Sequence, residues 1–250
     1  MSDPIFLPFC GAAPTLGDLA SRWTLDPLLL AFLVLLPAIR YAALPAGAPG
    51  AGDRWFWAGW AVLVVAFVSP LCALTVALFS ARVVHHLLLV VVAAPLLALS
   101  NPWRNRRLRG SLGLWLGLHA LTMWLWHAPL PYEMALRSDV VYWAMQASLL
   151  ATAILFWTRL FDPRTPPIAA AAVSLAAMMQ MGFLGALITF TPRPLYAAHA
   201  LTTEAFGLTP LADQQLAGLI MWAPGALPYL LVTLVSVASI VRPSPSDGRS

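Results

Sequence analysis

Long apolar runs, separated by short segments that hold the charges and turn residues, constrain this chain more than any other feature. A helix that crosses a bilayer needs about 20 predominantly apolar residues. The runs therefore predict seven transmembrane helices, over Leu25–Leu44, Trp55–Ser69, Val83–Leu99, Ser111–Trp126, Val140–Trp157, Ile168–Phe190 and Leu216–Ile240. The second run stays apolar beyond Pro70, which should break the helix and leave an interfacial segment up to Phe79.

The composition indicates an all-α, polytopic integral membrane protein. Of the 250 residues, 60% are hydrophobic and only 10% are charged, whereas soluble domains carry about 25% charged residues. This difference excludes an ordinary soluble globule, and the high hydrophobicity excludes disorder over most of the chain. We predict one bundle of about seven helices over 25–241, an N-terminal segment over 1–24 and a disordered tail over 242–250.

The distribution of arginine predicts the orientation of the bundle. The chain has 14 basic residues, all of them arginine, and they alternate in number from one predicted loop to the next. Because arginine-rich loops stay in the cytoplasm, we predict an outer N-terminus, a cytoplasmic C-terminus and a cytoplasmic loop around Arg104–Arg109. This basic loop is typical of membrane topology and contact with anionic lipid, rather than of nucleic-acid binding.

Metal-capable side chains gather towards the predicted outer ends of the helices. His119, Met123 and His127 are spaced four residues apart and therefore share one helix face. Imidazole and thioether groups suit Cu(I), a soft ion. His119 would lie roughly 12 Å below His127, near the bilayer centre, where a polar residue is a functional candidate. The stripe predicts a copper site, although methionine at helical spacing often serves only packing.

Three further histidines are candidates of lower specificity. His85 and His86 open the third predicted helix at its outer end, and His199 lies in the last outer loop. Adjacent residues are about 100° apart around a helix, so at most one of His85 and His86 should face the fourth helix. A histidine at a helix end is often only an interfacial hydrogen-bonding residue, and this interpretation stays open for each.

No pattern in the sequence predicts an enzyme. The chain lacks a CxxC, an HExxH and a glycine-rich phosphate loop, and no Ser-His-Asp arrangement is evident. Gly182 and Gly185 favour close helix packing over chemistry. Cys10 and Cys72 are too few for a disulfide framework, so one disulfide and none are both open at this point.

Four segments carry a resemblance to a known family. They are HHLLLVVVAAPLLAL (85–99), WLWHAPLPYEMAL (124–136), GFLGALITF (182–190) and DQQLAGLIMW (213–222). Together they resemble the signature segments of the CtaG-type (caa3-type) cytochrome c oxidase assembly factors, from about the second predicted helix to the seventh. The resemblance implies a multi-pass protein of the bacterial inner membrane that serves the biogenesis of haem–copper oxidases. Its expected partners are oxidase subunits, a periplasmic copper donor and membrane lipid, and no nucleic acid.

Carried over residue by residue, the resemblance points to His86, His127 and the start of the last helix. There, Asp213 would act as an outer orienting group, and Gln214 would help to fix histidine tautomers. The start of the last helix is Asp213-Gln214-Gln215, and His199, which the sequence places in the last outer loop, completes the supporting set with Asp213 and Gln214.

The chain also departs from the family pattern at three positions. Arg82, Tyr142 and Gln146 stand where many members of the family have histidine. These departures remove candidate ligands and favour either a different ligand set or no metal at all.

The sequence therefore predicts a membrane assembly factor that handles or delivers Cu(I) at the periplasmic face. His86 and His127 would be outer ligands, Met123 and His119 inner ligands, and His85 a further candidate. A metal-free scaffold for oxidase subunits is the main alternative, because of the three departures. A copper permease and a haem-binding electron carrier are further alternatives, although the cytoplasmic helix halves hold few polar groups and His119 lacks an obvious partner at its depth.

Overall fold

The computed structural model describes residues 7–43, 52–100 and 110–241, and within these ranges the chain is helical without strands. The helices are α1 (Pro27–Ala43), α2 (Asp53–Val68), α3 (Leu71–Ala77), α4 (Phe79–Leu87), α5 (Ala94–Leu99), α6 (Leu112–His127), α7 (Pro129–Leu136), α8 (Asp139–Leu160), α9 (Pro167–Phe190) and α10 (Pro210–Val241). A π-helical segment, Leu88–Ala93, joins α4 to α5. Short 3₁₀ turns lie at Leu19–Ser21, Ala197–His199 and Thr203–Phe206. The predicted tail over 242–250 and the loop around Arg104–Arg109 lie outside the described residues.

Each of the seven predicted apolar runs contains a helix, which confirms the all-helical interpretation. Four continuous helical segments are long and apolar enough to cross a membrane: Phe79–Leu99, Asp139–Leu160, Pro167–Phe190 and Pro210–Val241. The pair α2 and α3 makes a fifth if it counts as one bent span. Helix α6 has 16 residues, or roughly 24 Å at 1.5 Å per residue, against a hydrocarbon core of about 30 Å. By length and composition the described chain therefore has four or five spans, and a count of seven stays a prediction.

Proline determines two of the breaks. Helix α2 ends before Pro70, and α3 continues at an angle of 48°, as predicted from proline in an apolar run. Helix α6 ends at His127, where Ala128 adopts an extended conformation and Pro129 begins α7. Proline is favourable at the first position of a helix, and α7 was not predicted because its segment was interpreted as an outer loop.

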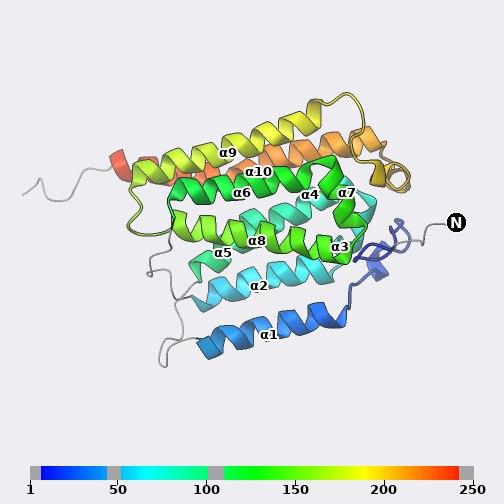
Figure 1. Ribbon diagram of the computed structural model, residues 1–250, viewed down its shortest axis with the longest axis horizontal. Helices are drawn as coiled ribbons and strands as arrows, with labels where there is room; N and C mark the ends of the chain where they lie inside the picture. The colour runs from blue at the N-terminus through cyan, green and yellow to red at the C-terminus, as the bar shows by residue number, and fades with distance from the viewer. Residues whose placement is uncertain (1–6, 44–51, 101–109, 242–250) are drawn as a thin grey trace, which may run out of the picture.

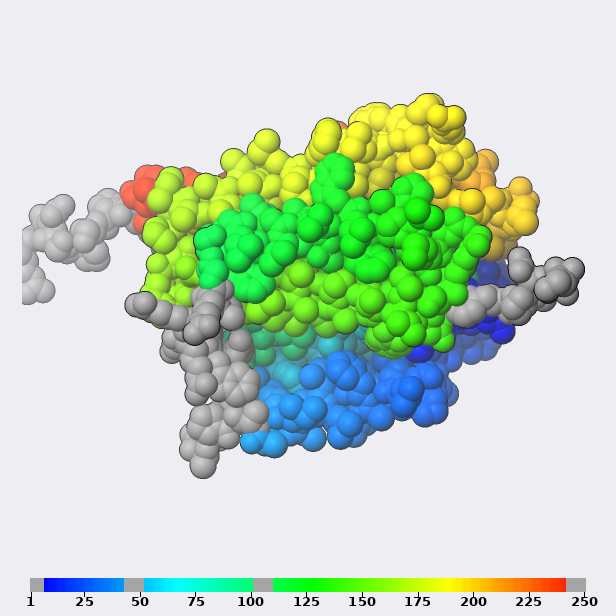
Figure 2. Space-filling model, viewed as in Figure 1, coloured from blue at the N-terminus to red at the C-terminus, as the bar shows by residue number. Residues whose placement is uncertain are grey.

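The helices run side by side and alternate in direction, so the molecule has two distinct ends (Figure 1). One end holds the N-terminal segment, α3, α7 and the loop between α9 and α10, and the other holds the C-terminal end of α10. In the space-filling view α6 and α8 cover the middle of one face, with α1 and α9 at opposite edges (Figure 2). Large apolar side chains are exposed on α1, α9 and α10, among them Leu28, Ile168 and Leu231, which is how a lipid-facing surface is built.

Helices α9 and α10 pack against each other through glycine. A Cβ atom placed on Gly218 would lie 2.5 Å from the Gly185 carbonyl oxygen, and one on Gly185 would lie 2.8 Å from the Gly218 carbonyl oxygen. Such contacts are too short for any side chain, so glycine allows the two backbones to meet. The packing role predicted for Gly185 is confirmed.

Candidate functional site: a buried histidine pair

His86 on α4 and His127 on α6 face each other inside the bundle, and we call them the histidine pair. His86 Nδ1 lies 3.4 Å from His127 Nε2, and the side chains are 1% and 3% exposed. The other nitrogen of His127, Nδ1, donates to the carbonyl oxygen of Met123 at 2.7 Å. Because a carbonyl can only accept, neutral His127 carries its proton on Nδ1 and directs the Nε2 lone pair at His86.

This arrangement has the form of a metal-ligating histidine. Ligating imidazoles commonly donate their second N–H to a carbonyl, which fixes the tautomer and the ring orientation. Two nitrogens at about 2.0–2.1 Å from one ion are about 3.3 Å apart when the angle at the ion is tetrahedral. The 3.4 Å between the two nitrogens therefore fits one edge of such a site, and it also fits a direct hydrogen bond between the rings.

His85 points away from the pair, as expected for a neighbour of His86 on a helix. Its ring meets Phe67 edge-on with the centroids 4.9 Å apart. The ring lies against the Ala66 backbone, although neither nitrogen makes a hydrogen bond of good geometry. His85 therefore packs on α2 and is not brought to His127.

His119, predicted as an inner ligand, has a partner that the sequence did not indicate. Its Nε2 lies 3.2 Å from the Tyr229 hydroxyl on α10, and its ring stacks on Phe156 at 5.5 Å. It lies two helical turns from His127, or roughly 12 Å along α6. The structure joins His119 to a tyrosine instead of to the histidine pair, because the facing residue of α10 at that depth is Tyr229.

The backbone of Met123 orients one member of the histidine pair. Met123 is fully buried, and its carbonyl oxygen is the group that orients His127. No group of three or more His, Cys, Asp or Glu side chains that could hold a metal ion occurs in the part of the chain that the structure describes. Among the described residues, the histidine pair thus offers two ligands of those residue types to an ion.

An aromatic cluster lies against His127 of the histidine pair, and we call it the aromatic roof: Phe79, Tyr132, Tyr196 and His199. Phe79 and Tyr196 stack with centroids 3.6 Å apart. The Tyr196 hydroxyl donates to the His127 carbonyl oxygen at 2.8 Å. The roof was not predicted, since its members come from α4, α7 and the loop after α9 and share no local pattern.

His199 belongs to the roof and not to the pair. Its Nε2 lies 2.7 Å from the Tyr132 hydroxyl. Burial, and to a smaller extent the nearby Arg82 charge, lower the pKa of His199 to about 4. Burial raises the pKa of Tyr132 to about 12. At neutral pH the phenol is therefore protonated and donates to a neutral imidazole.

Asp213 holds α4 in place. The backbone N–H of Phe79 donates to Asp213 Oδ2 at 2.7 Å, and that of Ser80 donates to Oδ1 at 3.2 Å, with a further bond from the Ser80 hydroxyl. These are the orphan donors at the start of a helix, which a carboxylate satisfies with favourable charge. Asp213 therefore orients the helix that carries His86, and both of its oxygens are committed to that task.

Gln214 ties the loop after α9 to α10. It accepts from the Leu195 N–H at 2.6 Å and donates to the Ile188 and Arg193 carbonyl oxygens at 3.1 and 3.4 Å. Its hydrogen bonds thus go to backbone groups, and the tautomer of His127 is fixed by Met123 instead.

The three departures from the family pattern lie together in the structure. Arg82 is buried, with its guanidinium carbon 5.5 Å from the centre of the Tyr142 ring, and Gln146 follows Tyr142 by one turn of α8. Arg82 Nη2 donates to the Thr75 carbonyl oxygen at 3.4 Å, while Nε and Nη1 lack a hydrogen bond. No carboxylate of the described residues lies within 4.0 Å of this guanidinium. A permanent, unpaired positive charge therefore lies one helical turn from His86.

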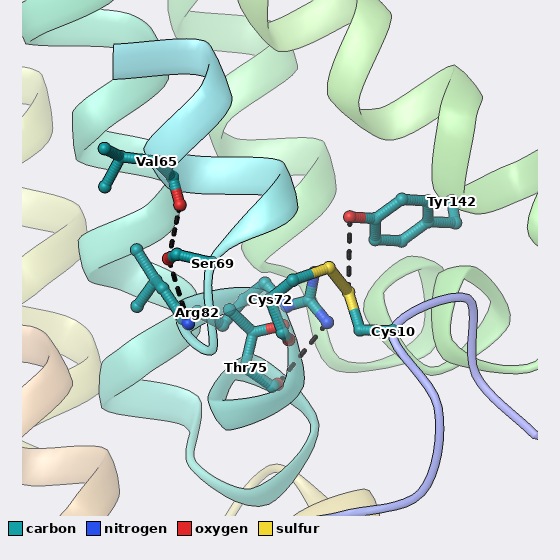
Figure 3. The surroundings of a disulfide bond; sticks show 8 residues. Cys10, Val65, Ser69, Cys72, Thr75, Arg82 and Tyr142 are labelled. Atoms are coloured by element: carbon teal, nitrogen blue, oxygen red, sulfur yellow. Dashed lines mark hydrogen bonds between the residues drawn. A yellow bond between two sulfur atoms is a disulfide. The ribbon is translucent and has the colours of Figure 1, made fainter. Parts of the chain in front are cut away.

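Cys10 and Cys72 form a disulfide, which settles the alternative that the sequence left open. The bond ties the N-terminal segment to α3, and Arg82, Thr75 and Tyr142 surround it (Figure 3). The Tyr142 hydroxyl lies 3.6 Å from Cys10 Sγ. The N-terminal segment is thereby held at the same end of the bundle as the aromatic roof.

Comparison with known families identifies the chain. The model of the cytochrome c oxidase caa3 assembly factor family (Caa3_CtaG) matches residues 30–115 and 113–243. No curated protein and no solved structure matches it significantly. Because the match covers most of the chain, this membrane protein belongs to the caa3-type cytochrome c oxidase assembly factors.

Proposed function

We propose that the chain assists the assembly of a haem–copper cytochrome c oxidase by holding Cu(I) transiently at the histidine pair. The observation that carries this proposal is the pairing of two buried imidazoles, 3.4 Å apart, with the lone pair of His127 directed at its partner by a backbone carbonyl. Neutral imidazole suits a copper ion. The ion would be cargo, and the protein's own part would be to bind, orient and release it without catalysing a reaction.

The number of ligands supports transfer over storage. Two imidazoles leave coordination positions for a third group, which an incoming donor or a receiving oxidase subunit would supply. A closed structural site has four protein ligands and releases its ion slowly. The pair is therefore better suited to exchange than to permanent binding.

We further propose that the end with the disulfide and the aromatic roof faces the periplasm. Disulfides persist in oxidising compartments such as the periplasm, and the Cys10–Cys72 bond lies at this end. Helix α1 ends and α2 begins at the opposite end, as do α8 and α9, and the arginines near these helix ends (Arg40, Arg54, Arg159 and Arg164) fit the cytoplasmic side. Both arguments support an outer N-terminus in the inner membrane of a bacterium.

Metal analysis of purified variants tests the proposal. The protein in detergent is loaded with Cu(I) without oxygen, desalted and assayed for bound copper by mass spectrometry. His86→Ala and His127→Ala should each lose the copper, and His119→Ala should retain it, because His119 is equally buried but bonded to Tyr229. Thermal unfolding of each variant shows whether the fold persists.

The outcomes separate the predicted ligand sets. If His119→Ala loses copper while His86→Ala retains it, the inner ligands predicted from the stripe are the real ones. If wild-type protein takes up no copper, the transfer role is wrong.

A metal-free scaffold is the second candidate, and Arg82 is the observation that favours it. A fixed positive charge one turn from His86 opposes a cation there. A scaffold predicts that all histidine substitutions are silent for oxidase activity, while disruption of the α9–α10 contact at Gly218 is not. Deletion of the gene distinguishes the two candidates, because missing copper with normal subunits indicates delivery and missing subunits indicate scaffolding.

A further inference from the structure

A cavity of about 500 Å³ lies between α1, α2 and α8, next to the N-terminal segment. Its volume falls within the range of roughly 300–1,000 Å³ that is typical of small-molecule sites. The inner walls are aliphatic and aromatic, with Leu33, Leu63, Phe67 and Leu150 among them. Helix α1 lies at the edge of the bundle (Figure 1), and its Leu28 and Phe32, which also line the cavity, are exposed. The cavity is therefore open towards the lipid phase.

One polar side chain is buried in this apolar wall without a partner. Gln146 is 2% exposed and lines the cavity. The Tyr142 hydroxyl lies near it, but neither amide atom makes a hydrogen bond of good geometry. An unsatisfied buried amide costs free energy, so a group that reaches the Gln146 amide from the cavity would gain the hydrogen bonds that the protein leaves unmade.

The mouth of the cavity is negative. Asp26 and Asp139 line it, and no basic side chain of the described residues does. Asp26 caps α1 by accepting from the Leu29 N–H at 2.9 Å, and Asp139 lies in the first turn of α8. Each helix N-terminus offsets about half a charge, so the two carboxylates leave about one net negative charge at the mouth. Gln146 lies seven residues beyond Asp139, or roughly 10 Å deeper along α8.

The N-terminal segment closes the outer side of the cavity. Phe9 lines it, stacks on Tyr142 at 5.1 Å and meets Trp143 edge-on at 4.9 Å. The next residue, Cys10, is tied to α3 by the disulfide. The disulfide therefore fixes Phe9 as a wall of the cavity.

We propose that this cavity binds a phospholipid whose headgroup carries an ammonium, namely a phosphatidylethanolamine. The ammonium lies at Asp26 and Asp139, the glycerol ester region meets the Gln146 amide, and an acyl chain lies along Leu33 and Leu63. Along the cavity the carboxylates, the amide and the apolar wall follow one another in the order of the ammonium, the glycerol esters and an acyl chain of the lipid. The phosphate, which lies between the ammonium and the glycerol, has no basic partner among the described lining residues and would stay in water at the mouth.

Native mass spectrometry of delipidated protein tests this proposal. The probes are palmitoyl-oleoyl phosphatidylethanolamine and the phosphatidylglycerol with the same chains. Wild-type protein should retain the ethanolamine lipid in preference to the anionic lipid. Gln146→Leu replaces the amide by an apolar side chain of similar size. It should weaken retention of the ethanolamine lipid about fivefold, which is the effect of one lost hydrogen bond. Asp26→Asn combined with Asp139→Asn should abolish the preference between the two lipids.

Two tryptophan variants provide the matched comparison. Ala147→Trp fills the cavity and should remove the retained lipid. Ala223→Trp fills a second hollow between α9 and α10, whose lining holds no charged residue, and should have no effect on the preference. Equal retention of the two lipids by wild-type protein would overturn the proposal. So would unchanged retention in both Gln146→Leu and Ala147→Trp, with thermal unfolding confirming that each variant is folded.

Discussion

Replacement of Arg82 by methionine should strengthen Cu(I) binding at the histidine pair. Arg82 and His86 are four residues apart on α4, so their Cβ atoms are about 5–6 Å apart. The guanidinium is buried and lacks a carboxylate within 4.0 Å among the described residues. Its charge therefore acts on an ion at His86 without an internal counter-charge.

The size of the effect follows from Coulomb's law. Two unit charges about 7 Å apart at an effective dielectric constant of about 20 repel by about 2 kcal/mol, which corresponds to roughly 30-fold in the dissociation constant. Arg82→Met removes this repulsion and keeps much of the side-chain volume. Arg82→Lys keeps the charge and is the matched control.

The assay is competition for Cu(I) against a chromophoric chelator, without oxygen and in detergent. We expect the dissociation constant of Arg82→Met to fall by roughly 30-fold and that of Arg82→Lys to stay near the wild-type value. Arg82→Met should also unfold at no lower temperature than wild type, because replacement of an unpaired buried charge by an apolar group is commonly neutral or stabilising. Equal affinity in both variants, or weaker binding in Arg82→Met alone, would refute the electrostatic argument.

Four further perturbations have defined outcomes. Asp213→Ala removes the cap of α4 and should cost about 1–2 kcal/mol of stability, measured by thermal unfolding. Gly218→Ala forces the α9 and α10 backbones apart and should cost about 1–3 kcal/mol, measured in the same way. Burial lowers the pKa of His199 from 6.5 in an unfolded chain to about 4 in the folded protein. The stability that its neutral form contributes is therefore complete above pH 6.5 and is lost as the pH falls towards 4. The loss amounts to about 3 kcal/mol, and His199→Gln should flatten stability over this pH range. Cys72→Ser opens a loop of 62 residues and should cost about 2–4 kcal/mol, an effect that a reducing agent should reproduce in wild type and not in the variant.

The helices could be predicted from the sequence because lipid leaves so few alternatives. A backbone in hydrocarbon must satisfy its own hydrogen bonds, so each apolar run became a helix, and Pro70 marked the break between α2 and α3. The number of spans could not be predicted in the same way. Helix α6 is apolar but short, and the chain after Ala128 continues as α7, because Pro129 suits a helix start as well as a loop.

Helical spacing in the sequence predicted which site residues share a helix face, but not which residues of other helices they contact. The spacing placed His119, Met123 and His127 on one face of α6, but the partner of each depends on which residue of another helix lies at the same depth. That register joins His127 to His86 and His119 to Tyr229. It is determined by packing between helices far apart in the chain, on which a single sequence carries no information.

The buried position of the histidine pair bears on how an assembly factor would hand over an ion. Both imidazoles are buried, and the Tyr196 hydroxyl of the aromatic roof donates to the His127 carbonyl oxygen. The segment 191–209 carries Tyr196 and His199 of the aromatic roof, and the contacts that hold it include Tyr132 with His199 and the bonds of Gln214. If copper is delivered here, the aromatic roof keeps the ion from solvent until a partner displaces the segment. Docking of an oxidase subunit and release of the ion would then be one event.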